Sequence, residues 1–283
     1  MFMWLPSLFV GVTFTPQKSS TVNIRYKEFK PAASLNDYVE SYWYVTSDLP
    51  ADCYTGPNIC IPKGTVELII NLEGGISQVL LDDQWINLDT AIIVGIQSNP
   101  ITWRMSGNCV KFGIRLKPET FINLFNTPLA DLYQKYFNVE TLAGDRFSWL
   151  INMLQKAPDM ESRIAIAESF LHKKLTAVKE GNRLITHAIR KIWMEDGNIS
   201  TASLSRSVYI GERQLQRLFK NSMGISPKLY SRIVRFKSAY NQAQSGKFVA
   251  WADVAYELGY ADQAHFVKDF KNFTGVTPTA LFN

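Results

Sequence analysis

The sequence contains little histidine and cysteine, and their scarcity excludes several kinds of chemistry. Three histidines occur in 283 residues and the first is His172, so the preceding 171 residues offer no imidazole for a metal site or for acid–base catalysis. The three cysteines, Cys53, Cys60 and Cys109, lack a Cys-x-x-Cys spacing, so the sequence indicates neither a disulfide framework nor a zinc site. We therefore expect reduced thiols in a cytoplasmic protein without a metal, a cofactor or catalytic residues.

Long apolar runs are also absent, which argues against a membrane partner. Residues 1–14 are strongly apolar and carry no lysine or arginine, but a membrane span needs about 20 apolar residues and a secretory signal needs a basic start. We interpret residues 1–21 as an apolar lead-in. It is a strand, an unstructured segment, or a stretch upstream of the true translation start; we favour the last, and a mass spectrum of the native protein that includes Met1 would contradict it.

The net charge of +5 is small, but it is unevenly distributed along the chain. Residues 183–283 hold 14 Lys and Arg against 7 Asp and Glu, a net charge of +7, whereas residues 1–182 hold 16 against 18, a net charge of −2. The basicity therefore belongs to the C-terminal hundred residues, where a polyanion would bind.

Residues 24–117 are predicted to form an antiparallel β-domain. They read as short extended segments separated by turn residues, and the segment 65–72 is the clearest because it is rich in β-branched residues and is followed by Gly74 and Gly75. The alternating segments 101–105 and 110–116, on either side of Ser106-Gly107-Asn108, predict a hairpin. Short strands at this spacing predict a small barrel or a sandwich.

After Pro118, apolar residues recur every three or four positions, which predicts helices over residues 119–176. The helical segments are predicted at 119–125, 129–137, 147–154 and 160–175. Gly181 is suited to end a helix, and we place the domain boundary there, with an N-terminal domain at 22–180 and a C-terminal domain at 183–283.

The C-terminal domain contains one pattern twice: a short helix, a tight turn and a second helix that ends in Phe-Lys. Aligning Phe219 on Phe270 also places Gly224 on Gly275 and Pro227 on Pro278. The simplest account is two helix-turn-helix units, at 200–222 and 251–273, joined by a long linker helix at 227–244. The fold class expected for the whole chain is therefore multidomain α+β.

The second helix of each unit carries long polar side chains outside its buried stripe. Ordinary solvated helix faces have the same composition, but the repetition and the charge surplus favour contacts with DNA. The candidate DNA-binding residues are Arg213, Gln214, Gln216, Arg217 and Lys220 in the first unit, and Gln263, Ala264, His265, Lys268 and Lys271 in the second.

Three C-terminal segments are distinctive: Glu212-Arg-Gln-Leu-Gln-Arg-Leu-Phe-Lys, Gly224-Ile-Ser-Pro-Lys, and Asp253-Val-Ala-Tyr-Glu-Leu-Gly-Tyr-Ala-Asp-Gln-Ala-His-Phe. Together they resemble the DNA-binding domain of the AraC/XylS family of bacterial transcription regulators. The resemblance implies that the second helix of each unit enters the major groove of double-stranded DNA. Tyr209 stands where many members have a turn glycine and Gly211 where many have a serine cap, so we expect a strained turn or a weak cap in the first unit.

Residues 61–72 and 113–119 resemble, less specifically, the sensing half of one branch of that family. The resemblance implies a β-rich, cupin-like barrel that binds an effector or mediates dimerisation. The effector is unknown. The candidate pocket residues are Trp43, Trp85, Trp103 and Arg115, together with Tyr44, although aromatic residues of this kind more often fill a core.

The leading hypothesis is a sequence-specific transcription regulator that is not an enzyme. The resemblance implies double-stranded DNA, a small-molecule effector and RNA polymerase as partners, and a homodimer. Two alternatives are enzymes that carry an AraC-type domain: a DNA-repair alkyl acceptor, which needs clustered reactive cysteines, and a metal-dependent cupin, which needs N-terminal histidines.

Overall fold

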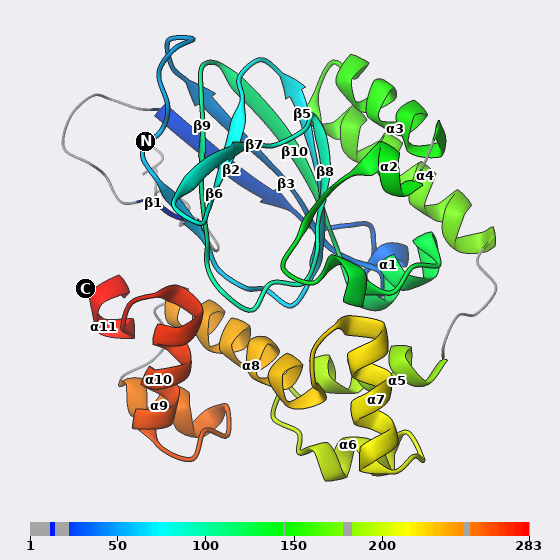
Figure 1. Ribbon diagram of the computed structural model, residues 1–283, viewed down its shortest axis with the longest axis vertical. Helices are drawn as coiled ribbons and strands as arrows, with labels where there is room; N and C mark the ends of the chain where they lie inside the picture. The colour runs from blue at the N-terminus through cyan, green and yellow to red at the C-terminus, as the bar shows by residue number, and fades with distance from the viewer. Residues whose placement is uncertain (1–11, 15–22, 144, 178–182, 246–249, 283) are drawn as a thin grey trace, which may run out of the picture.

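The protein has a β-rich N-terminal part followed by helices, as Figure 1 shows for the computed structural model. The structure describes residues 12–14, 23–143, 145–177, 183–245 and 250–282. Most of the apolar lead-in and the boundary at Gly181 therefore lie outside the described residues. The strands are β1 (Val12–Phe14), β2 (Asn23–Phe29), β3 (Val39–Asp48), β4 (Asn58–Cys60), β5 (Val66–Glu73), β6 (Ser77–Leu81), β7 (Gln84–Asn87), β8 (Ala91–Val94), β9 (Ile101–Met105), β10 (Cys109–Leu116) and β11 (Tyr136–Asn138).

The strands form two antiparallel sheets. One sheet has the order β1-β4-β9-β6-β7, and the other has the order β11-β8-β5-β10-β3-β2. Strand pairing among the described residues does not close them into one barrel, so the β-rich prediction is confirmed in the form of two sheets that enclose a cavity.

The alternation of side chains along β10 separates the two faces of the larger sheet. Phe112 and Ile114 are buried in the main core beside the helices, whereas Lys111 and Arg115 point to the cavity between the sheets. Gly113 lies on the cavity side, where a Cβ atom would stand 2.0 Å from the Trp43 ring, so only glycine fits.

The predicted hairpin of residues 101–105 and 110–116 is wrong. Both segments are strands, but β9 pairs with β4 and β6, while β10 pairs with β3 and β5 in the other sheet. The turn at Gly107 therefore carries the chain from one sheet to the other. Alternation identifies a strand but not its partner, which depends on which faces must be buried.

All of the described helices except η1 come after β10 in the sequence. The helices are η1 (Ala33–Leu35), α1 (Pro118–Phe125), η2 (Leu129–Leu132), α2 (Val139–Ala143), α3 (Asp145–Lys156), α4 (Met160–Ala177), α5 (Arg183–Met194), α6 (Thr201–Ser207), α7 (Glu212–Met223), α8 (Pro227–Gln244), α9 (Trp251–Glu257), α10 (Gln263–Thr274) and α11 (Pro278–Phe282). Among these described helices, none is both long and apolar enough to cross a bilayer.

The helix predicted at 129–137 is wrong. Its first residues form the short 3₁₀ helix η2, and Tyr136–Asn138 form β11, which pairs with β8. Gln134 between them has a positive φ of 55°, which a helix cannot contain. The apolar spacing that suggested a helix arises because Leu129 and Leu132 are both buried one 3₁₀ turn apart.

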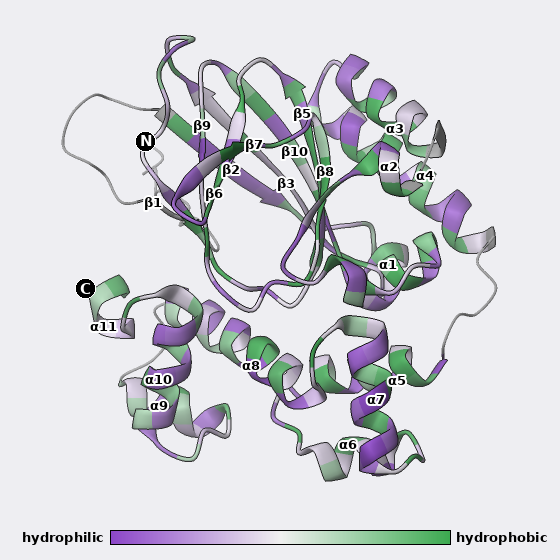
Figure 2. Ribbon diagram, viewed as in Figure 1, coloured by the Kyte–Doolittle hydropathy of each residue, from purple (hydrophilic) through white to green (hydrophobic). Residues whose placement is uncertain are grey.

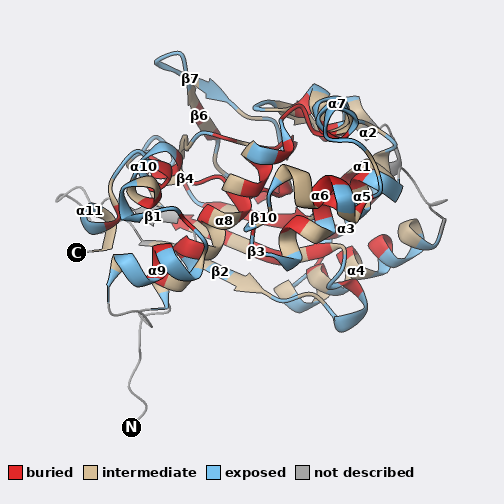
Figure 3. Cartoon of the chain, turned by 90° about the horizontal axis from the view of Figure 1, so that it is seen from below, coloured by how far each residue is buried: buried red, intermediate tan, exposed pale blue. Residues whose placement is uncertain are grey.

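Helix α8 lies beneath the β-domain and separates α5–α7 from α9–α11 (Figure 1). Figure 3 shows it in the middle of the molecule, with buried residues along its length. Arg235 donates to the backbone carbonyls of Gly197 and Gly259, at 3.0 and 3.3 Å, so this one side chain bridges the segments before α6 and before α10. Arg232 pairs with the buried Asp269 of α10 at 2.6 Å.

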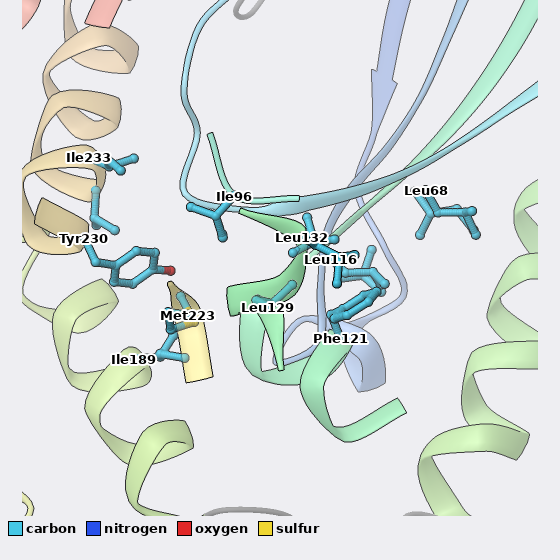
Figure 4. Close-up of a cluster of buried hydrophobic side chains, with 14 of the residues drawn as sticks. Leu68, Ile96, Leu116, Phe121, Leu129, Leu132, Ile189, Met223, Tyr230 and Ile233 are labelled. Carbon is cyan, nitrogen blue, oxygen red and sulfur yellow. The ribbon is translucent and has the colours of Figure 1, made fainter. Parts of the chain in front are cut away.

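The N-terminal domain and the C-terminal helices share one continuous apolar core (Figure 4). Polar contacts fix the same interface: Trp193 donates to the Tyr230 hydroxyl at 2.8 Å, and this hydroxyl donates to the Gly64 carbonyl at 3.0 Å. Lys237 of α8 forms an ion pair with Glu40 of β3. The apolar side chains that meet there include Ile96, Leu129 and Leu132 from one side, and Ile189, Met223, Tyr230 and Ile233 from the other.

Glu119, in the first turn of α1, is buried at this interface and has a long ion pair in place of hydrogen bonds to other described side chains. It is 1% exposed, neither carboxylate oxygen accepts a hydrogen bond from another described residue, and the nearest cation, Arg190 of α5, lies 3.7 Å away. Burial raises the pKa of Glu119 to about 7, although Lys117 and Arg190 act to lower it.

We expect Glu119→Gln to flatten the pH dependence of stability. The pKa of Glu119 is raised from 4.5 to about 7 in the folded state, so its contribution to the free energy of unfolding is full below pH 4.5 and is lost as the pH rises through about 7. The loss is of the order of 3 kcal/mol and is absent from the glutamine variant.

Urea unfolding of both proteins at about pH 5 and about pH 8 measures the difference. Glu161→Gln, at an exposed carboxylate of α4, is the control and should leave the pH dependence as it is in the wild type. Equal pH dependence in the wild type and Glu119→Gln would show that Glu119 is ionised throughout.

Candidate nucleic-acid interface and inner cavity

The first helix-turn-helix unit consists of α6 and α7. Ser200 caps α6 by accepting a hydrogen bond from the Ser203 backbone N–H at 3.0 Å, and α7 ends at Gly224 with φ of 76°. Leu215 and Phe219 face the core, so the other positions of the first turns of α7 are left to solvent.

The second unit consists of α9 and α10 and repeats this construction. Asp262 caps α10 by accepting a hydrogen bond from the His265 backbone N–H at 2.7 Å, and α10 ends at Gly275 with φ of 83°. A proline follows each unit at the first position of the next helix, Pro227 of α8 and Pro278 of α11. The two units are therefore equivalent in three dimensions as well as in sequence.

The polar side chains predicted to contact DNA are on the outer faces of these two helices. Figure 2 shows α7 as largely hydrophilic. Nine of the ten candidates are exposed and His265 is half-buried. The exposed side chains with no ion pair or hydrogen bond to any described residue are Arg213, Gln214, Gln216, Arg217, Gln263, Lys268 and Lys271.

Two candidates also have contacts within the protein. The Lys220 ammonium donates to the Gly224 carbonyl at 2.9 Å, which satisfies the C-terminal end of α7. The His265 ring packs edge-on against Tyr260, and its Nε2 lies 4.0 Å from the Asp269 carboxylate. These contacts hold Lys220 and His265 more firmly than their neighbours.

The C-terminal end of α7 also lies against the N-terminal domain. A Cβ atom on Gly224 would stand 2.9 Å from the Tyr133 side chain and 3.1 Å from the Ala130 backbone, so this glycine permits the close approach. The sequence does not reveal this contact, because it joins residues about 90 positions apart.

A cavity of about 120 Å³ lies between the two sheets of the N-terminal domain. Aromatic and aliphatic side chains form most of its wall, and polar groups enter it from β5, β6 and β10. Its lining residues include Tyr26, Trp43, Val45, Lys63, Glu67, Ile69, Ser77, Val79, Ile92, Ile101, Trp103, Lys111 and Arg115.

Arg115 is the centre of a buried polar network in this wall. Its guanidinium donates to Glu67 and Glu28, both at 2.8 Å, to Ser41 at 2.9 Å and to Tyr26 at 3.3 Å. Burial alone would raise the pKa values of Glu67 and Glu28, but Arg115 and Lys63 more than offset this and hold both pKa values below 4.5. The network is thus ionised and satisfied within the protein.

The structure brings together three of the candidate effector residues. Trp43, Trp103 and Arg115 line the cavity, whereas Trp85 of β7 does not, and the Arg104 guanidinium lies over its ring at 4.1 Å. Tyr44 stacks on Phe29, on the face of β3 opposite Trp43.

Lys111 is a cavity residue that the sequence analysis did not single out. It is 7% exposed, and no described residue forms an ion pair or a hydrogen bond with its ammonium group. The signal that could have found it is the alternation of β10, which places Lys111 on the same face as Arg115.

The cysteines are not brought together in a reactive cluster. Cys53 is exposed, Cys60 is half-buried and Cys109 is buried; burial raises the pKa of the Cys60 and Cys109 thiols, which keeps them in the unreactive protonated form. Within the described ranges, no group of three or more His, Cys, Asp or Glu side chains is placed to hold a metal ion.

Comparisons with known families match the two parts of the chain separately. Residues 204–283 match a family described as a helix-turn-helix domain, and residues 27–138 match a domain of unknown function (DUF6597). The C-terminal part of the chain is an AraC-type helix-turn-helix domain.

Curated relatives match over part of their length. An uncharacterized HTH-type transcriptional regulator of Haemophilus influenzae is 24% identical over 159 residues, which are 56% of this chain and 53% of the relative. The Msm operon regulatory protein of Streptococcus mutans is 25% identical over 164 residues, 56% of this chain and 51% of the relative. The match thus spans about half the length of these relatives.

Solved structures with some similarity include ToxT from Vibrio cholerae O395 and the AraC-like transcriptional activator CuxR. ToxT is 13% identical, with a TM-score of 0.46 over 86% of this chain and 97% of that chain. CuxR is 14% identical, with a TM-score of 0.34 over 82% of this chain and 86% of that chain. Similarity at this level says nothing about ligand or activity.

The first unit of the AraC-type domain has both the expected strain and the expected weak cap. Tyr209, in the turn between α6 and α7, has a left-handed φ of 57°, and its side chain is 94% exposed, so packing does not offset the strain. Gly211 occupies the N-cap of α7 and provides no side-chain hydrogen bond, whereas Asp262 does so for α10. In the second unit, Gly259 takes the left-handed position.

We expect Tyr209→Gly to be more stable than Tyr209→Ala by about 1 kcal/mol, because glycine adopts a left-handed φ without the Cβ clash. Both variants lose the exposed ring, so their difference isolates the backbone effect. Urea unfolding followed by tryptophan fluorescence measures the free energies of unfolding, and equal stability of the two variants would contradict a strained turn.

Proposed function

We propose that the protein is a sequence-specific, DNA-binding transcription regulator that responds to an effector. The observation that carries this proposal is the pair of equivalent helix-turn-helix units in a domain of net charge +7. The second helix of each unit presents long side chains that have no hydrogen bond or ion pair to any described residue. Side chains of this type hydrogen-bond base edges and phosphates, and the charge surplus attracts the DNA backbone.

The length of the linker helix α8 allows both units to bind the same face of a DNA duplex. Its 18 residues extend over about 27 Å, and the units lie on its two sides (Figure 1). Successive major-groove segments on one face of DNA are about 34 Å apart. In this proposal α7 and α10 enter neighbouring segments, so one chain reads two adjacent half-sites.

A loop provides a route from the cavity to the DNA-binding domain. Residues 61–65 are all buried; Ile61, Lys63 and Thr65 line the cavity, while Gly64 meets α8, where a Cβ atom would contact Ile233 and Tyr230 at 3.4–3.5 Å. Because residues 61–65 contact both the cavity and α8, a ligand in the cavity would alter the position of α8. We propose that an effector acts through this loop.

The remaining parts of the proposal follow from the role of a regulator. The protein acts in the cytoplasm on double-stranded DNA, has no catalytic activity, and contacts RNA polymerase when bound near a promoter. Two copies form a homodimer through the N-terminal domain. These statements are supported by the AraC-type domain and by the regulatory proteins it matches.

Selection from genomic DNA tests the function as a whole. Purified full-length protein is mixed with sheared genomic fragments of its host at about 150 mM salt, where non-specific binding is weakened by counterion release, and the bound fragments are sequenced. A few enriched fragments that share a motif with two half-sites are expected. Uniform recovery of fragments would overturn sequence-specific binding.

We expect Arg217→Ala to weaken binding to a selected fragment by about tenfold to a hundredfold, and binding to random DNA of the same length by much less. Arg217 is exposed on α7 and has no partner in the described chain, so its removal leaves the fold intact. Gel shifts on both DNAs at the same salt concentration measure the two losses.

Lys173→Ala is the matched control, since it removes one positive charge from an exposed position on α4 and should change neither affinity. Equal losses on the two DNAs with Arg217→Ala would make Arg217 a phosphate contact instead of a base contact.

A further inference from the structure

The cavity between the sheets contains a buried ammonium group that forms no ion pair or hydrogen bond with any described residue. Lys111 is 7% exposed and extends from β10 into the cavity wall. The thiol of Cys109 lies near enough to act on it, but burial raises the pKa of Cys109, so this thiol remains neutral. Burial likewise lowers the pKa of Lys111, since an unpaired ammonium is poorly solvated there.

The other cations of the cavity are different. Arg115 is paired with two carboxylates, and Lys63 lies 3.9 Å from Glu28. Their charges are therefore already compensated by side chains of the protein. The cavity lining thus contains one satisfied ionic network, the Asp89 carboxylate, and one cation that forms no ion pair with any described residue.

A cation left without a counter-charge in a cavity is a site for an anion. An isolated buried charge costs several kcal/mol, and a ligand carboxylate at hydrogen-bond distance would offset much of this cost. Ser77 lines the same cavity with a hydroxyl that has no hydrogen-bond partner in the described part of the chain. It adds a neutral donor to the polar groups of the wall.

The rest of the wall determines what the anion is attached to. Trp43 and Tyr26 stack at 5.9 Å, and with Trp103, Val45 and Ile69 they form a small apolar cluster on the cavity side of the sheets. A volume of about 120 Å³ is slightly below the roughly 150 Å³ of a cavity that encloses benzene, so it suits a small ligand of about one ring or one short alkyl chain. An inorganic anion has no apolar part to contact this wall, whereas an organic acid does.

We propose that the cavity binds a small organic acid, with its carboxylate on the Lys111 ammonium and its apolar body between Trp43 and Trp103. The inference deepens the proposed function, on which it rests only in regarding the bound acid as the effector. Binding itself is independent of DNA and is measured without it.

The test uses full-length protein with three acids, benzoate, phenylacetate and hexanoate, each compared with its neutral amide. Calorimetry gives the dissociation constants, and thermal melts give the ligand-dependent stabilisation. At least one acid should bind with a Kd below about 1 mM and at least tenfold more tightly than its amide. Chloride at the same ionic strength should not reproduce the effect.

Two lysine variants separate a cavity contact from a general charge effect. Lys111→Met keeps the length of the side chain but removes the charge, so it should melt at a higher temperature than the wild type without ligand and should bind the acids at least tenfold more weakly. Lys156→Met removes an exposed charge from α3 and should match the wild type in both respects.

A fluorine label on the tryptophans locates the acid without relying on Lys111→Met. With 5-fluorotryptophan in place of tryptophan, the signals assigned by Trp43→Phe and Trp103→Phe should shift on addition of the acid, while that of Trp149, exposed on α3, should not.

Three results would overturn the inference: no acid binding by the wild type, equal binding of acid and amide, or equal acid binding by Lys111→Met and the wild type. Failure here with intact DNA selection leaves the proposed function standing. Acid binding by a protein that selects no DNA would instead overturn the proposed function.

Discussion

The packing of α8 against the loop at residues 61–65 is the contact on which the rest of the structure depends. Tyr230 makes it specific, because its ring is fully buried beside Phe219 of α7 and its hydroxyl donates to Gly64. Farther along the helix, Phe236 packs on Phe270 and Phe273 of α10 at 5.4 and 5.0 Å. One helix thus supplies core residues to the N-terminal domain and to both helix-turn-helix units.

This sharing explains why few of the 18 residues of α8 are exposed. An ordinary surface helix buries one stripe, but nine residues of α8 are buried on several sides. A change that displaces α8 would expose apolar surface in three places at once, so its position should change between discrete arrangements and not gradually. The two units would then move with α8 as a consequence.

The sequence predicts local structure well in this protein and long-range structure poorly. The C-terminal units follow from caps, turns and apolar spacing within about 25 residues, and the glycine ends at Gly224 and Gly275 lie where they were expected. Strand positions were also predictable from alternation. Strand partners were not, because β9 and β10 are neighbours in sequence but belong to different sheets, a choice made by burial on both sides of the larger sheet.

The candidate site shows the same division. Exposure of Arg213 and Arg217 follows from the apolar stripe of one helix, so sequence suffices for it. Whether a buried charge is compensated depends on residues far apart in the chain. Arg115 is paired with Glu28 of β2 and Glu67 of β5, whereas Lys111 on the same strand face has no such partner in the described part of the chain. No spacing rule distinguishes these two residues.

The buried Lys111 and Glu119 differ in their partners: Lys111 forms no ion pair with any described residue, whereas Glu119 lies 3.7 Å from Arg190. Lys111 is in the cavity and Glu119 is where α1 meets α5, while the satisfied network around Arg115 and the loop at residues 61–65 lie between the cavity and α8. A ligand shifts a conformational equilibrium only by the difference in its affinity for the two states. A buried charge that a ligand neutralises would supply such a difference wherever the two states differ in how they enclose the ligand. In the proposed function, the Lys111 charge would thus couple ligand binding in the cavity to the position of the helix that carries both units.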